Sequence, residues 1–464
     1  MRAPTAALVA AFGVSRLVFW ASGVRLDTAP FGRYFQFVDP DLLQHQLAQS
    51  LWYLHSQPPL FNAFLGLVVK LPGPSKPVFW AAYLLFGLAL TLLLYRLLIA
   101  LGFTPWVAAG IAAIYAVSPQ TVLLENWLFY DYPVTVLLVG SVLALNWFVR
   151  SPSAWSGSAF FGLVAALVLT RSVFQLAWVA LALAVAAVAC PSWRLLSAVA
   201  AAPLALVLLV YVKNLVLFGT FVTSSWYGMS LAQTTMPNIS VADRAALVRR
   251  GDLSPLVLIY PFSPLRDFPH RWSYVSLRHV TVLDRAVYAP TERNNFNHSA
   301  YLGISAQYFR DWRWVILHRP GAYLDGVANG GRIFFDPVED EDAFLRNGNM
   351  ASLGTYDSAY RDVFFSVARL GIRFRLIRVL WALTLLYTAV RLPFWLRDRR
   401  VPRATKATLV YICLAVLYVV AAWLSTDVGE AFRARATLEP LALFVLLPYA
   451  VREIGQALAG RVRS

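Results

Sequence analysis

Asp39 and Asp41 are two carboxylates one residue apart, in a polar loop that follows the first long apolar run of the chain. Such a pair can share a cation, or one member can take a proton as general base while the other orients it. The same residues also suit the start of a helix predicted from Leu42 to Leu54, because an aspartate side chain accepts hydrogen bonds from the first free backbone N–H groups. Spacing alone leaves both interpretations open.

A histidine and a pair of prolines follow this loop. Pro58 and Pro59 predict a corner where one helix ends and the next begins, since proline fits the first turn of a helix. His55, just before the corner, is a candidate binding residue. A histidine packed at the membrane surface is the alternative interpretation.

A second pair of acids, Glu125 and Asp131, lies between two later apolar runs. Asp131 is a candidate catalytic acid and Glu125 a candidate to assist it. The alternative for Asp131 is the N-cap of a helix that starts at Pro133, and an N-cap can also be part of a site.

Arg171 interrupts an apolar stretch between residues 160 and 189. A charge within the hydrocarbon costs about 2.5–3.5 kcal/mol even on lenient scales, so this arginine needs an interfacial position. A hairpin turn at the membrane border meets that need, and a guanidinium there can hold two phosphate oxygens. An arginine that merely extends to the interface is the alternative. Lys213, at the end of a later apolar run, is a weaker candidate of the same kind.

The last apolar run opens with three charged residues, Glu430, Arg433 and Arg435. Both arginines are candidate site residues. Glu430 and Arg433 would share one face of a helix, so an ordinary interfacial salt bridge is the alternative interpretation.

The composition indicates which kind of fold holds these residues. Of the 464 residues 59% are hydrophobic and only 14% are charged, with a mean hydropathy of +0.59, whereas soluble proteins carry about 25% charged residues. Repeated apolar runs near 20 residues long can cross the bilayer only as helices. The sequence therefore predicts an all-α polytopic membrane protein with about ten spans. The net charge of +16 fits basic membrane loops and phosphate-bearing lipids, and we expect no nucleic-acid partner.

The runs divide the chain into three parts. We expect an N-terminal transmembrane module of about seven spans over 1–216, with a first outer loop at 25–77. A mixed extracytoplasmic segment follows over 217–373, and a C-terminal module of about three spans covers 374–464. The short loops rich in arginine all fall on one side, which the positive-inside rule makes cytoplasmic together with both termini. All the candidate residues then lie on the extracytoplasmic side, so we expect the active site there.

The order of these motifs along the chain resembles the GT-C superfamily of glycosyltransferases. An Asp-x-Asp pair, a Pro-Pro-Leu corner, a Ser-Pro followed by an acid, a Thr-Arg and an Arg-x-Arg come in turn at the membrane border. The chain is most similar to the branch that contains protein O-mannosyltransferases and the aminoarabinose transferases of lipid A (glycosyltransferase family 39-like). The resemblance covers the whole chain in layout, except that segment 217–373 matches no domain of that branch.

The resemblance implies a GT-C-like helical bundle in the inner (plasma) membrane. It implies transfer of a hexosyl or pentosyl group, with inversion, from a polyprenyl-phosphate donor to a hydroxyl of a glycan, lipid or protein in the cell envelope. Asp39 or Asp41 would be the catalytic base, with Asp39 preferred, and Asp131 the second acid. Arg171, aided by Arg433 and Arg435, would meet the lipid phosphate.

The resemblance leaves the cofactor open. Some relatives use a divalent metal and others do not, and Asp39 and Asp41 would be its ligands here. A polytopic transporter or lipid flippase is the competing interpretation of the whole chain, because it too would have many spans and buried charges. Against it stand the absence of a visible internal repeat and the position of the charges at one interface.

Overall fold

The computed structural model describes residues 2–190, 192–269, 280–288, 291–335, 347–364, 376–398, 401–426 and 429–462. Nearly all the regular structure in these ranges is helical, and the strands described are the short antiparallel pair β1 (Val287–Tyr288) and β2 (Arg293–Asn294). The prediction of an all-α polytopic membrane protein is confirmed at this level.

The helices up to residue 218 are α1 (Arg2–Ala21), α2 (Ala29–Arg33), α3 (Pro40–His45), α4 (Leu47–Trp52), α5 (Pro59–Val69), α6 (Ser75–Ala100), α7 (Pro105–Ala116), α8 (Pro119–Glu125), α9 (Asp131–Arg150), α10 (Ala154–Thr170), α11 (Leu176–Ala189) and α12 (Trp193–Phe218). The later helices are α13 (Tyr227–Thr235), α14 (Val241–Arg250), α15 (Thr281–Asp284), α16 (Ala300–His318), α17 (Pro320–Phe334), α19 (Gly348–Phe364), α20 (Leu376–Arg397), α21 (Arg403–Thr426), α22 (Ala431–Leu441) and α23 (Leu447–Val462).

Seven of the described helices are long and apolar enough to cross a membrane: α1, α6, α9, α12, α20, α21 and the continuous helix Ala431–Ala459. The pair α7 and α8, bent by 63° at its break, makes an eighth if it is one span. The predicted count of ten is not confirmed, because α10 and α11 are apolar but have only 17 and 14 residues. At 1.5 Å per residue, the shorter of them covers about 21 Å of a hydrocarbon core near 30 Å.

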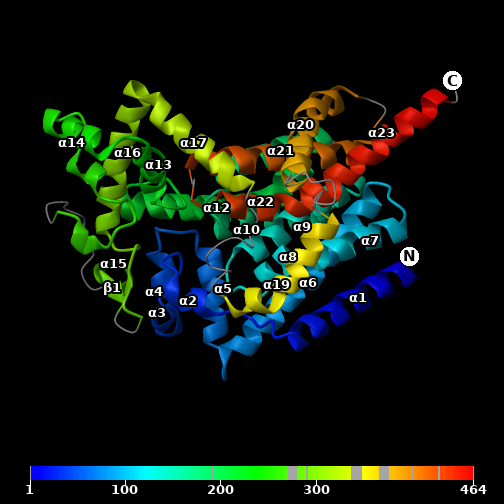
Figure 1. Ribbon diagram of the computed structural model, residues 1–464, viewed down its shortest axis with the longest axis horizontal. Coiled ribbons are helices and arrows are strands. Elements are labelled where there is room, and N and C mark those ends of the chain that lie inside the picture. The colour runs from blue at the N-terminus through cyan, green and yellow to red at the C-terminus, as the bar shows by residue number, and fades with distance from the viewer. Residues whose placement is uncertain are drawn as a thin grey trace.

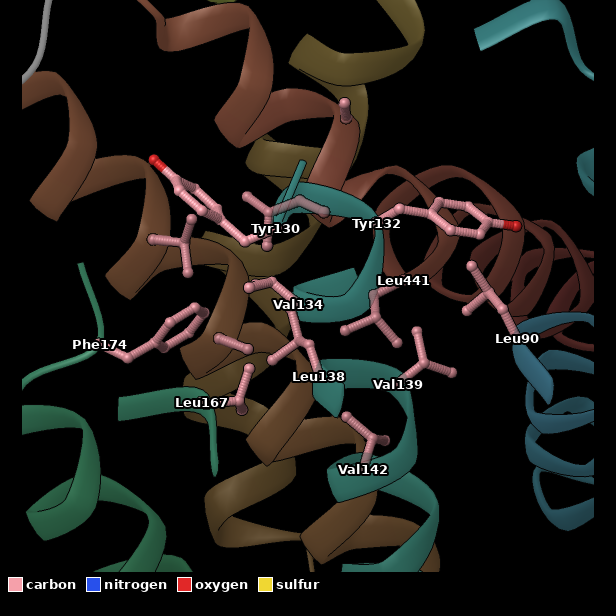
Figure 2. Close-up of a cluster of buried hydrophobic side chains, with 14 of the residues drawn as sticks. Leu90, Tyr130, Tyr132, Val134, Leu138, Val139, Val142, Leu167, Phe174 and Leu441 are labelled. Carbon is pink, nitrogen blue, oxygen red and sulfur yellow. The ribbon is translucent and has the colours of Figure 1, made fainter. Parts of the chain in front are cut away.

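Helix α9 is the central element of the bundle. It packs against α6, α10 and α21, and its side chains are buried on most of its faces. Figure 2 shows Tyr130 and Tyr132 leaving the start of this helix in opposite directions, with Leu138 and Val142 lower along it. A helix held on several sides presents its first turn, which carries Asp131, in a fixed position.

The two chain termini lie at one end of the molecule, and several helices that follow α12 in the sequence lie at the other. Figure 1 shows both termini at one end of the long axis, and α13, α14 and α16 at the other. These last helices have a hydrophobic cluster of their own around Trp226, Tyr301 and Tyr308. The described part of segment 217–373 thus combines its own core with helices, such as α17, that contact the bundle.

A proline changes the geometry of the last span. Pro440 lies inside α22 and supplies no backbone N–H, and the five residues Ala442–Leu446 that follow form a π-helix. Such wide turns appear most often near functional sites. Here the wide turn follows the buried stretch that carries Arg433 and Arg435.

Candidate functional site

Arg171 lies at the turn between α10 and α11, where it forms the C-cap of α10. Its guanidinium lies between two aromatic rings, 4.4 Å from the centre of Tyr130 and 4.5 Å from that of Trp423. Carboxylate oxygens of Asp131 and Glu430 are each 3.9 Å away, beyond hydrogen-bond distance. Among the residues that the structure describes, none accepts a hydrogen bond from this guanidinium. No residue in the described part of the chain therefore occupies its five N–H donors.

Arg171 also lines two neighbouring cavities, of about 510 Å³ and about 210 Å³. Ser172, Ser224 and Ser230 also line both cavities. The larger cavity continues along hydroxyl and aromatic side chains that include Tyr211, Tyr227, Tyr418, Trp423, Ser425 and Thr426. The smaller is lined by amides and one acid, namely Gln36, Gln57, Gln233 and Glu430. Polar groups that converge in a hollow beside aromatic rings are typical of a small-molecule site.

Arg433 has a different role from Arg171, although both lie near Asp131. Its Nε and Nη2 donate to the two carboxylate oxygens of Asp131, at 2.6 and 3.2 Å, and its Nη1 donates to Glu430. Only 2% of its side chain is exposed. The donors of Arg433 are therefore occupied by these two acids, and this pairing orients Asp131 and Glu430 beside Arg171. The alternative interpretation of Glu430 and Arg433 as a salt bridge is confirmed.

Arg435 is buried on another face of α22. Its Nη2 donates to the side-chain oxygen of Gln120 at 3.0 Å, and its Nη1 is 3.8 Å from Glu439. It lines neither of the two cavities around Arg171. The structure therefore places it with α8, away from Arg171.

Glu125 belongs to a buried network that sequence reasoning missed. Arg16 of α1 donates to both of its carboxylate oxygens, at 2.9 and 2.6 Å, and Tyr132 donates to it at 3.0 Å. A Cβ added at Gly87 would lie 2.1 Å from Glu125 Oε2, so only glycine leaves room for this carboxylate. The network joins α1, α6, α8 and α9, and Glu125 acts in it as a structural partner. The signal that could have found Arg16 is a charge inside the first apolar run.

Asp39 and Asp41 do not converge. Asp39 is 1% exposed and is the N-cap of α3, where it accepts hydrogen bonds from the Asp41 backbone N–H at 3.0 Å and from the Thr291 hydroxyl at 2.7 Å. Asp41 is about half exposed, and its carboxylate is 3.5 Å from His45. The N-cap interpretation is thus confirmed for Asp39. No group of three His, Cys, Asp or Glu side chains that could hold a metal occurs within the described ranges.

Two of the local helix predictions are wrong. The helix expected from Leu42 to Leu54 breaks at Gln46, whose φ and ψ of −131° and 36° are not helical, so α3 and α4 are separate. Asp131 is also not the N-cap of a helix that starts at Pro133. Helix α9 already begins at Asp131, with Tyr130 as its N-cap. The Asp131 carboxylate therefore lies in the first turn of α9, where a negative charge is favoured by the helix dipole.

Aromatic contacts among the described residues connect the loop that carries Asp39 to the surroundings of Arg171. Phe37, two residues before Asp39, has its ring 6.0 Å from that of Tyr130, on which Arg171 lies. The side-chain partner described for Asp39, Thr291, belongs to segment 217–373 and not to the group around Arg171. Among the described residues, Asp39 and Arg171 therefore have no side-chain partner in common.

His55 and Lys213 join the first outer loop to the end of α12. The Nδ1 of His55 is 2.7 Å from the Ser225 hydroxyl, and Lys213 Nζ donates to the Leu54 carbonyl at 2.7 Å. His55 is fully buried, and this burial, with a smaller effect of the Lys213 charge, lowers its pKa to about 3. The imidazole is therefore neutral at physiological pH. The alternative of a packed histidine fits these contacts.

Comparison of the chain with protein-family models, with curated proteins and with solved structures found no match. The feature that bears on function is the geometry around Arg171. Arg171 is a cation whose donors are unoccupied among the described residues, and it lies between two aromatic rings and two acids in the turn that joins α10 and α11.

Proposed function

We propose that the chain is an integral membrane glycosyltransferase that moves a sugar from a polyprenyl-phosphate donor to an acceptor hydroxyl. The observation that carries the proposal is Arg171, whose guanidinium lines both cavities and has no hydrogen-bond acceptor among the described residues. A planar guanidinium with free donors suits two oxygens of a phosphate. Its place at a turn between two apolar helices suits a phosphate that is attached to a lipid.

In this proposal Arg171 holds the phosphate and stabilises the charge that develops on it. The acceptor oxygen forms a bond with the anomeric carbon while the bond between that carbon and the phosphate oxygen breaks, and the phosphate keeps the electron pair. Charge stabilisation of this kind is usually the largest catalytic term. Asp131 and Glu430, both near Arg171, hold the guanidinium in place but also lower its affinity for an anion. This favours a ligand with one negative charge, such as a phosphodiester.

Asp39 is the proposed general base that takes the proton of the acceptor hydroxyl. Its burial and its hydrogen bond from Thr291 give it a fixed orientation, and an attack from the side opposite the phosphate would invert the anomeric centre. Asp131 is less suited to be the base, because a cation, the Arg433 guanidinium, pairs with both of its oxygens, whereas the oxygens of Asp39 accept hydrogen bonds from neutral donors.

We place the site on the extracytoplasmic side of the inner membrane, with both termini in the cytoplasm. The support is the distribution of basic residues. Arg96, Arg150, Arg194 and Arg397 lie at or near the helix ends remote from Arg171, and such residues are enriched on the cytoplasmic side.

The test is mass spectrometry of envelope glycans and glycolipids from a deletion strain complemented with variants of the chain. We expect a sugar modification to be lost on deletion, and to be restored by the wild type and by Arg194→Gln, a control at the other end of the bundle. Arg171→Gln should not restore it at equal protein levels. Unchanged glycans in the deletion strain would refute the proposal, and a transport defect with unchanged glycans would favour a flippase.

A further inference from the structure

A third hollow, separate from the two cavities that Arg171 lines, lies on the bundle far from Arg171. It has a volume of about 560 Å³ and is formed by α6, α9 and α10. Its floor is apolar and includes Leu93, Leu137, Gly140 and Leu163. Because these helices belong to the apolar bundle, the groove faces the region that lipid chains occupy.

Two arginines border this groove at one end. Arg96 lies in the last turns of α6, and Arg150 is the last residue of α9. Both side chains are exposed. Arg150 donates a hydrogen bond to the Ala100 carbonyl at 2.6 Å. Neither arginine has an acidic partner among the residues that the structure describes.

The remaining features of the groove also suit a lipid. Trp147, 43% exposed, lines it one turn before Arg150, and tryptophan is enriched at the level of lipid headgroups. A Cβ added at Gly140 would meet Leu163 and Leu93 only at ordinary contact distances of 3.5 and 3.6 Å. A methyl group at Gly140 therefore fits without moving the backbone, and a longer side chain there would extend from the floor of the groove.

We propose that this groove binds an anionic glycerophospholipid, with its phosphate between Arg96 and Arg150 and an acyl chain along the floor. Charge complementarity argues for this occupant, because two cations without acids border an otherwise apolar groove, and basic pockets between membrane helices bind acidic headgroups. The site is separate from the proposed donor site. Helix α10 begins at Ala154, four residues after Arg150, and ends at Thr170, next to Arg171, and its 17 residues cover about 26 Å.

Native mass spectrometry of the purified full-length protein tests this inference. The probes are phosphatidylglycerol and phosphatidylcholine with identical acyl chains. We expect phosphatidylglycerol to be retained about 10-fold more strongly, since each arginine near a headgroup phosphate contributes to binding. The double variant Arg96→Gln, Arg150→Gln should lose this preference, and Gly140→Leu should reduce retention of both lipids.

The controls separate the groove from general charge effects. Arg249→Gln with Arg313→Gln removes the same charge from exposed positions on α14 and α16, and should keep the preference. Equal retention of the two lipids by the wild type, or loss of preference in this control, would overturn the proposal. So would displacement of phosphatidylglycerol by an equal amount of polyprenyl phosphate. Each variant is compared at an unchanged size-exclusion profile, and Gly140→Leu tests the groove without altering charge.

Discussion

Three arginines predicted to bind phosphate have three different surroundings. Arg433 donates to Asp131 and Glu430, and Arg435 donates to Gln120 beside Glu439. Arg171 lies against aromatic rings with its donors free among the described residues. Removing one partner of a buried ion pair leaves an uncompensated charge, which costs about 3–5 kcal/mol. Variants of Arg433 should therefore report mainly on stability, whereas under the proposed function variants of Arg171 should report on phosphate binding.

The two aspartates of the first outer loop should differ in effect. Under the proposed function, Asp39→Asn should lower the transfer rate by about 10²–10⁴-fold, the usual contribution of a general base. Asp41→Asn should leave the rate near that of the wild type, because its carboxylate is half exposed and directed toward His45. The measurement is transfer from a polyprenyl-phosphate sugar by purified protein. Asparagine caps a helix as well as aspartate does, so thermal unfolding should be unchanged in both variants.

His55 should make the stability of the protein depend on pH. Its pKa in the fold is about 3, below the usual value near 6.5, so the folded state favours the neutral imidazole. The neutral imidazole of His55 makes its full contribution to the free energy of unfolding above about pH 6.5. This contribution is lost as the pH falls toward 3, by up to about 1.4 kcal/mol per pH unit. Thermal unfolding between pH 7 and 5 should depend less on pH in His55→Gln. His45→Gln, an exposed histidine, should behave like the wild type, and an equal slope in all three proteins would contradict this.

At the scale of elements, the residues around Arg171 come from helix ends. Asp131 lies in the first turn of α9, Arg171 caps α10, Trp423 lies in the last turn of α21 and Glu430 caps α22. Charged groups at helix ends avoid the cost of the hydrocarbon and can interact with helix dipoles. The packing of α9 against α10, α21 and α22 brings these ends together.

The packing of α17 on α13 depends on a glycine. A Cβ added at Gly326 would lie 2.0 Å from the Thr234 carbonyl oxygen of α13, whereas one added at Gly331, on the same helix, would meet nothing within 4 Å. Gly326→Ala should therefore lower the free energy of unfolding by about 1–3 kcal/mol or more, because the backbone must move. Gly331→Ala should leave it unchanged or raise it by up to about 1 kcal/mol, since alanine favours helix. Thermal unfolding in detergent measures both, and equal effects would contradict the close packing.

At the scale of the whole molecule, α9 and α10 connect two regions of different chemistry. Their ends near Arg171 border polar cavities, and their other ends border the groove with Arg96 and Arg150. Each helix is held by its neighbours along its length. A lipid in the groove would therefore stabilise helices that also carry Asp131 and Arg171.

The proposed orientation can be tested by cysteine labelling. The chain has two cysteines, Cys190 and Cys413, and both are buried, so the background should be low. A cysteine in place of the exposed Ala242 on α14 should react with a membrane-impermeant maleimide in intact cells. One in place of the exposed Ser151, between α9 and α10, should react only after the membrane is permeabilised. The reverse pattern would place the site in the cytoplasm.

Much of the local organisation follows from the sequence, because helices in lipid satisfy their own backbone hydrogen bonds. The apolar runs predicted the seven helices that are long enough to span, although not their number, and the cost of a charge in hydrocarbon predicted that Arg171 lies in a turn between two apolar helices. Short helix boundaries were less predictable. The break at Gln46 and the start of α9 at Asp131 depend on contacts that the local sequence does not contain.

The amino-acid sequence is enough to show that this is a helical membrane protein and which of its residues are costly to bury. The partners of those residues follow only from the packing of the helices. Arg433 meets Asp131 across 302 positions of the chain, and Arg16 meets Glu125 across 109. Whether Arg171, Arg433 or Arg435 has unoccupied hydrogen-bond donors among the described residues likewise depends on how the helices pack. The physical reason is that an ion pair needs its two groups within about 4 Å in space, and distance along the chain does not set that separation.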